Sequence, residues 1–276
     1  MKPRAARLRA AAQALGAVCG CLLALLAALS LTLFREGHYV RQLERSGVLP
    51  AICANVRQGG RQVAQAAGLR ADILDSLVTE EAVRVAVIRR ADEIWHGASD
   101  QPASPYAGAV AYLQDPLTRE SGVLWTDADA DLYRNVQLIC DDMWRTNTAP
   151  PLANLLNYLM QYRRLAWAPM AAAAALLAGC LWMLVRLCRG WRQLCRALAG
   201  LGAAIALGAL WGVLAICACG WQTWMPAADP GYGLYCSWFA ALPVMLAVCG
   251  AVLAGGVWLC AAGALAMARR RQRAER

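Results

Sequence analysis

The chain has 276 residues, 59% of them hydrophobic, and it carries a formal net charge of +9 at pH 7. This apolar fraction and a positive mean hydropathy are well above those of an ordinary soluble protein, so a membrane protein is indicated. A basic excess can also indicate nucleic-acid binding, but the distribution of the basic residues along this chain argues against that interpretation.

Four apolar stretches are each long enough to cross a bilayer as a helix. None contains Asp, Glu, Lys or Arg, and each has the roughly 20 residues needed to span about 30 Å of hydrocarbon. They are residues 11–34, 165–185, 197–219 and 238–267. The first could instead be a secretory signal, because a basic start precedes it and Ala28-Leu29-Ser30 fits a cleavage site. The apolar run continues to Phe34, so an uncleaved anchor is favoured.

The charges indicate which side of the membrane each connecting segment faces. Residues 1–10, 186–196 and 269–276 each carry a net charge of +4, whereas residues 35–164 carry −2. Because basic segments stay in the cytoplasm, we predict that both termini lie there and that residues 35–164 lie outside. The basic charge therefore indicates membrane insertion, and we expect the lipid bilayer and no nucleic acid as a partner. All but one of the 27 basic residues are Arg, which suggests a GC-rich genome and a bacterial cell membrane.

These features predict an all-α membrane protein with four transmembrane helices and an all-α extracytoplasmic domain between the first two. The predicted segments are a basic cytoplasmic tail (1–10), helix 1 (11–34), the extracytoplasmic domain (35–164), helix 2 (165–185), a basic cytoplasmic loop (186–196), helix 3 (197–219), an aromatic outer loop (220–237), helix 4 (238–267) and a basic cytoplasmic tail (268–276).

Apolar residues at helical spacing predict several helices within residues 35–164. Thr79 is a cap candidate before Glu80 and Glu81, and Gly97 ends the apolar stripe that follows, which predicts a helix over residues 80–96. Other stripes are Ile52, Val56, Val63 and Ala67; Leu132, Val136, Ile139, Cys140 and Met143; and Leu152, Leu155, Leu156, Leu159 and Met160. Residues 98–125 are rich in Pro, Gly and Ser and are expected to form a loop.

The stretch TDADADLYRN, residues 126–135, resembles the start of a calcium-binding loop. Such a loop needs Gly at its sixth position and Glu at its twelfth, and counting from Asp127 these positions hold Leu132 and Leu138. We therefore interpret the stretch as a helix start, with Thr126 as the cap and acidic residues in the first turn. A weak surface calcium site is the alternative.

Catalytic motifs are missing from the sequence. His38 and His96 belong to no metal-binding pattern, and no nucleophile elbow, phosphate-binding loop or dinucleotide fingerprint occurs. The predicted transmembrane segments contain no charged residue, which argues against an ion-coupled transporter or a charged channel. We expect no enzyme activity, no cofactor and no bound metal.

Two groups of residues suggest structural roles. Cys53 and Cys140 are the two cysteines of the predicted outer domain, where they could form a disulfide or remain reduced core thiols. A small-residue stripe in the third span lets another helix approach closely, either within its own bundle or from a second copy or a membrane-protein partner. The stripe consists of Gly200, Ala204, Gly208 and Gly212.

The runs HYVRQLERSGVLPAICANVRQ and GLRADILDSLVTEEAVRVAVIRRADEIWHG resemble the outer region of a group of uncharacterised bacterial four-span membrane proteins. The resemblance covers about sixty residues and implies a helical insert between the first two spans. It implies no activity and no site residues.

We expect a non-enzymatic membrane protein that senses, binds or scaffolds through its outer domain. The alternative is a permease subunit of an ABC-type transporter, whose topology is similar and which needs a separate ATPase. Against it, LCRGWRQLCRALAG between the second and third spans lacks a polar segment for docking an ATPase, and such permeases carry strands in their outer domain.

Overall fold

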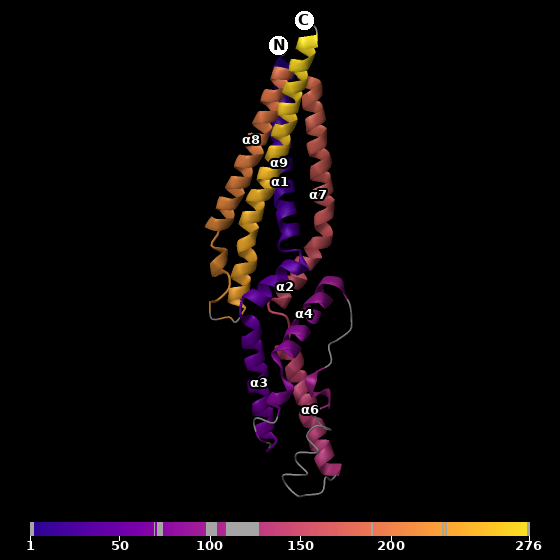
Figure 1. The fold of residues 1–276 in the computed structure, drawn as a ribbon, viewed down its shortest axis with the longest axis vertical. Helices are drawn as coiled ribbons and strands as arrows, with labels where there is room; N and C mark the ends of the chain where they lie inside the picture. Colours follow the sequence, from indigo (N-terminus) through magenta and orange to yellow (C-terminus); the bar gives the residue numbers. More distant parts are fainter. Residues whose placement is uncertain are drawn as a thin grey trace. The chain divides into compact units, whose positions relative to one another are not determined.

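The computed structural model describes residues 3–68, 70, 74–97, 104–108, 127–188, 190–227, 229 and 231–274. Every regular element in these residues is a helix, which confirms the predicted all-α class for the described chain. The residues form two compact units (Figure 1). The bundle unit comprises Met1–His38, Leu159–Pro226 and Trp238–Arg276, and the insert unit comprises Tyr39–Tyr158 and Ala227–Ser237.

Four long helices supply the bundle unit, namely α1 (Pro3–Leu31), α7 (Ala153–Leu187), α8 (Trp191–Ala218) and α9 (Tyr232–Ala274). Each contains a segment long and apolar enough to cross a membrane, as the sequence predicts. All four helices are longer than the predicted spans, and two of them extend far into segments predicted to lie outside the membrane. α7 is continuous from Ala153, and α9 begins at Tyr232, so the expected aromatic loop is shorter and includes a short 3-10 helix, η3 (Trp221–Thr223).

α1 and α8 run parallel in a fixed register (Figure 1). Three side-chain hydrogen bonds to α8 each join residues 184 positions apart, and this constant difference defines a parallel pair. They run from Arg9 to Gln193 Oε1 (3.2 Å), from Gln13 to the Ala197 carbonyl (2.9 Å) and from Cys21 to the Ile205 carbonyl (3.8 Å).

Glycines allow this close approach. A Cβ at Gly16 would lie 3.3 Å from Leu201, and one at Gly20 would lie 2.5 Å from Ile205. Gly16 and Gly20 form a GxxxG motif that the sequence analysis missed.

The small-residue stripe of α8 lies mainly at contacts inside the bundle unit. Gly200 approaches Gln13 and Gly208 approaches Cys21, both on α1, while Gly212 approaches Leu246 on α9. Ala204, the fourth residue of the stripe, is exposed. Three of the four predicted residues therefore contact neighbouring helices of the same chain.

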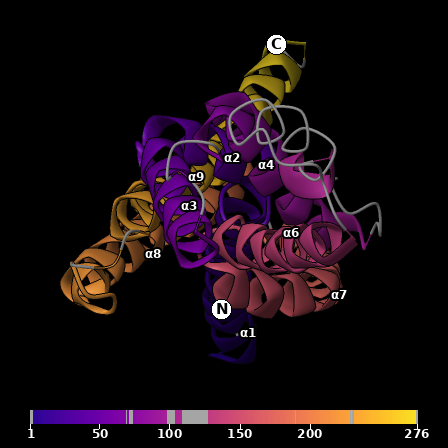
Figure 2. The same ribbon diagram turned by 90° about the horizontal axis from the view of Figure 1, so that it is seen from below.

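The insert unit is built around an antiparallel pair, α3 (Val48–Ala66) and α6 (Asp127–Asn147), which lie side by side in Figures 1 and 2. The other helices are α2 (Glu36–Arg45), whose first residues belong to the bundle unit, η1 (Asp75–Leu77), α4 (Glu80–His96) and η2 (Pro105–Gly108). Of the predicted loop 98–125, only residues 104–108 are described, and Thr126 also lies outside the described residues.

α4 has the caps that its sequence predicts. The Ala82 amide donates a hydrogen bond to Thr79 Oγ1 at 3.1 Å, and the helix ends at Gly97, whose φ of 72° is left-handed. The predicted face of α6 is partly wrong. Val136, Cys140 and Trp144 are buried at a spacing of four, whereas Leu132 and Ile139 are 45% and 55% exposed.

We predict that Gly20→Leu destabilises the bundle unit. The new side chain would collide with Ile205, and overpacking of this kind typically costs about 1–3 kcal/mol. The matched control is Gly179→Leu in α7, where an added Cβ meets nothing within 4 Å. In thermal unfolding of the detergent-solubilised protein, the melting temperature should fall for Gly20→Leu and stay unchanged for Gly179→Leu. Equal melting temperatures for the two variants would contradict the α1–α8 packing.

Candidate functional site

The insert unit contains a cavity of about 380 Å³. Its walls come from α4, η2 and α6, and its lining residues are Thr79, Glu81, Ala82, Val85, Ala86, Arg89, Pro105 and Trp144. The volume lies within the range of about 300–1,000 Å³ that is usual for small-molecule sites.

One face of α4 forms the longest wall. The wall residues Ala82, Val85, Ala86 and Arg89 occupy positions i, i+3, i+4 and i+7, which share one helix face. From Thr79 to Arg89 the wall extends about 15 Å, at 1.5 Å per residue. The wall is apolar in the middle, with polar side chains toward its ends.

Trp144 of α6 provides an aromatic wall and an unused hydrogen-bond donor. The residue is 1% exposed, and its Nε1 is buried without a hydrogen-bond partner among the described residues. The Trp144 ring meets Tyr106 edge-on, with ring centroids 6.3 Å apart and planes at 86°. Buried donors are nearly always paired, so this indole N–H is an exception, and it has no exposed surface through which it could open into the cavity.

The two charged residues of the lining differ in their surroundings. Glu81 shares Arg84 with Glu44: the Arg84 guanidinium lies 3.1 Å from Glu81 Oε1 and 2.6 Å from Glu44 Oε1. These two carboxylates raise the pKa of Arg84, and the largest contribution comes from its hydrogen bond to Glu44. Arg89 makes no ion pair within the part of the chain that the structure describes. The two charged residues of the described lining therefore have opposite signs, and neither sign is in excess.

Next to the cavity, Tyr106 is fully buried and its hydroxyl also lacks a partner among the described residues. The ring fits there because position 60 is Gly: a Cβ at Gly60 would lie 3.2 Å from the hydroxyl. Burial raises the pKa of Tyr106, and Cys140 and Asp75 raise it further, so the hydroxyl stays protonated at neutral pH.

Cys53 and Cys140 are free, buried thiols, the second of the two alternatives that the sequence leaves open. Met143 packs on Gly59 between the antiparallel helices. After burial, which has the largest effect, both cysteines contribute to the raised pKa of the Tyr106 hydroxyl. Burial, with a contribution from Asp141, raises the pKa of Cys140 to about 11, so its thiol is a poor nucleophile at neutral pH.

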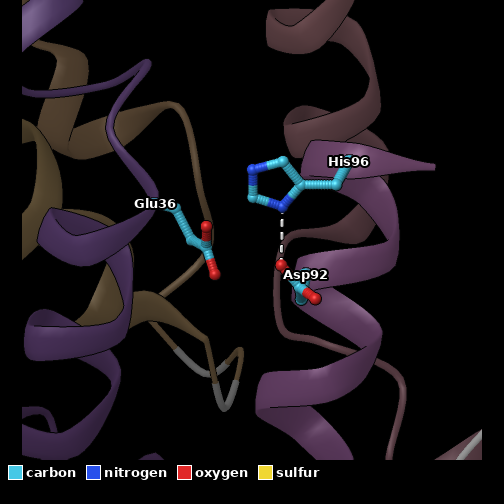
Figure 3. Close-up of side chains that lie close together, drawn as sticks. All are labelled: Glu36, Asp92 and His96. Atoms are coloured by element: carbon cyan, nitrogen blue, oxygen red, sulfur yellow. Dashed lines mark hydrogen bonds and ion pairs between the residues drawn. The ribbon is translucent and has the colours of Figure 1, made fainter. Parts of the chain in front are cut away.

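The histidines do not contribute to the cavity. His96 lies at the end of α4, where its Nδ1 is 2.6 Å from Asp92 Oδ1 (Figure 3), and both side chains are about half exposed. Glu36, also labelled there, and His38 belong to the bundle unit.

Comparison with known proteins yields no match: no family model, curated protein or solved structure is similar to the chain. The residues of the cavity are therefore interpreted from their own chemistry. Sequence reasoning found Thr79 as a cap but missed Trp144 and Arg89 as lining residues. The sequence did contain one indication that Trp144 is buried: it follows Cys140 by four residues and so lies on the same helix face.

We predict opposite effects for two Tyr→Phe substitutions in the insert unit. Tyr106→Phe removes an unpartnered buried hydroxyl and should leave the free energy of unfolding unchanged or raise it by about 1 kcal/mol. Tyr39→Phe should lower it by about 1–2 kcal/mol, because the Tyr39 hydroxyl donates a 2.8 Å hydrogen bond to the Pro151 carbonyl. Denaturant unfolding of the purified protein provides the measurement. A loss of stability in Tyr106→Phe would mean that its hydroxyl is hydrogen-bonded after all.

Proposed function

We propose that this chain is a multi-pass membrane protein that binds a small molecule in the cavity of its insert unit, as a sensing or binding protein rather than an enzyme. The observation that carries the proposal is the cavity of about 380 Å³, whose described lining is mostly apolar and includes the buried residue Trp144. A concave, mostly apolar site with a few polar groups is the usual form of a ligand site.

The chemistry of the lining supports binding rather than catalysis. Thr79 Oγ1 already accepts the helix-capping hydrogen bond, and Glu81 is paired with Arg84. The described lining residues include no His or Cys, so they offer no imidazole base beside a thiol nucleophile. What remains is a largely apolar surface with charged side chains, Glu81 and Arg89, toward its ends.

The proposal also includes an orientation in a bacterial cell membrane. With the termini and residues 186–196 in the cytoplasm, the three most basic segments share one side and the near-neutral insert faces outward. The insert then meets ligands outside the cell, and the bundle unit transmits or anchors the response.

An ABC-type permease subunit is the less supported function. Its outer domain should contain strands, whereas the insert unit is helical wherever it is described. The loop between α7 and α8 is also short, since α7 ends at Leu187 and α8 begins at Trp191.

We predict that trypsin added to sealed right-side-out vesicles cuts the insert and spares both termini. Exposed arginines such as Arg134, whose side chain is 71% exposed, offer cleavage sites. With different epitope tags at the two ends, blots should show two tagged fragments in place of the full chain, and both tags should survive. Loss of either tag before the vesicles are opened would refute the orientation.

We also predict that filling the cavity abolishes ligand binding without unfolding the protein. Val85 lines the cavity and is 36% exposed, so Val85→Trp can occupy the space without disturbing the core. In a thermal-shift screen of small molecules, compounds that stabilise the wild-type protein should lose their effect on Val85→Trp. The control is Leu138→Trp, on an exposed part of α6 outside the cavity lining, which should behave as wild type. A screen in which every stabilising compound acts equally on Val85→Trp would refute the site.

A further inference from the structure

We infer that the basic end of the bundle unit binds an anionic phospholipid, with Arg186 as the residue that contacts the lipid phosphate and Trp182 as the residue that positions Arg186. This inference goes beyond ligand binding in the insert unit and rests only on the membrane-spanning part of the proposed function. It specifies which headgroup the chain prefers, whereas contact with lipid tails is common to every membrane-spanning helix.

One buried core holds the ends of four helices together at this end of the bundle unit. Ala12 of α1, Leu184 of α7, Leu194 of α8 and Ala264 of α9 belong to the same cluster of buried residues. Only three residues separate the end of α7 from the start of α8. α1 begins and α9 ends at this same end (Figure 1). Arginines on these helix ends are therefore displayed around one rim.

The rim carries positive charge and few acids. The arginines on it whose side chains are described are Arg4, Arg7, Arg9, Arg186, Arg192 and Arg196, and all except the half-buried Arg9 are exposed. Residues 1–34 and 159–228 contain no Asp or Glu, and the one acid after α9, Glu275, is outnumbered by the five Arg of residues 269–276. A lipid with a net negative headgroup therefore meets an excess of cations here. The ammonium group of a zwitterionic lipid finds no carboxylate in those two segments.

Arg186 stands out on this rim because an aromatic ring supports it. Its guanidinium carbon lies 5.2 Å from the centroid of the Trp182 ring, one turn earlier on α7, in a cation–π contact. A guanidinium stacked on a ring keeps N–H donors at its edges, where they can bind two phosphate oxygens at once. Trp182 is 62% exposed, and tryptophan rings prefer the headgroup level of a bilayer, which is the depth of the lipid phosphates.

From this pair toward the middle of α7, small side chains leave room for a lipid tail. Gly179, Ala175 and Ala172 precede Trp182 at intervals of three, four and three residues, so they share its helix face, and all three are exposed. A Cβ added at Gly179 would meet nothing within 4 Å. From Trp182 to Ala172 this face extends about 15 Å, which is half of a hydrocarbon core about 30 Å thick. A lipid of one leaflet can therefore place its phosphate at Arg186 and one acyl chain along α7.

The test measures the lipid preference of the full-length protein by native mass spectrometry from micelles that contain equal amounts of phosphatidylglycerol, which is anionic, and phosphatidylcholine, which is zwitterionic. We expect bound phosphatidylglycerol to exceed bound phosphatidylcholine about fivefold or more, and Arg186→Gln to lower this ratio about twofold to fivefold, as the loss of one arginine at an anionic surface predicts. Trp182→Leu should lower the ratio as well. Both variants together should lower it no further than Arg186→Gln alone, because the ring acts through the guanidinium. Both positions are exposed, so the melting temperatures should match that of the wild type.

Arg35→Gln is the matched control, since it removes the same charge from an exposed position just beyond the opposite end of α1. It should leave the ratio unchanged. Equal binding of the two lipids to the wild type overturns the inference, while the trypsin digestion tests the membrane topology separately. An equal loss in Arg35→Gln and Arg186→Gln overturns the assignment to the basic end. A double variant with a clearly larger loss than Arg186→Gln overturns the positioning role of Trp182.

Discussion

The close approach of α3 and α6 at Gly59 and Gly60 is the contact on which the insert unit depends. Met143 packs against Gly59 and the Tyr106 ring against Gly60, so two neighbouring positions without side chains set the spacing of α6 and of η2. Trp144 then follows Met143 on α6 and lines the cavity beside Pro105. A side chain at either glycine would therefore shift the aromatic wall of the site, although the glycines lie outside the cavity lining.

The sequence predicted features that depend on local hydrogen bonds and composition. The four long apolar helices follow from composition alone, and α4 could be bounded because a cap at Thr79 and a terminator at Gly97 act within a few residues. Contacts between distant segments could not be predicted in this way. Apolar periodicity favoured Ile139 for the core of α6, whereas packing against α3 and η2 buries Trp144. The parallel register of α1 and α8 also depends on pairing residues 184 positions apart, for which no local pattern exists.

The turn between α6 and α7 shows how a buried polar group stabilises an unfavourable backbone. Leu152 has a φ of 65°, a left-handed conformation that a residue with a Cβ seldom adopts. The preceding carbonyl, that of Pro151, accepts a hydrogen bond from the fully buried Tyr39. The Tyr39 ring packs against Trp95 of α4 in a tilted arrangement, with ring centroids 5.4 Å apart and planes at 39°. The Tyr39 hydroxyl therefore stabilises this turn through its hydrogen bond, whereas the Tyr106 hydroxyl has no hydrogen-bond partner among the described residues.

The three arginines Arg84, Arg89 and Arg90 of α4 differ in what they contact. Arg84 lies between Glu44 and Glu81 and so ties α2 to the start of α4, and Arg90 caps the Arg145 carbonyl of α6. Both arginines are used by the fold. Arg89 lies between them in sequence on the cavity face, and the described chain gives it no such structural task. Arg89 is exposed, so solvent screens its charge, and the contacts that fix α4 within the insert unit come from Arg84 and Arg90.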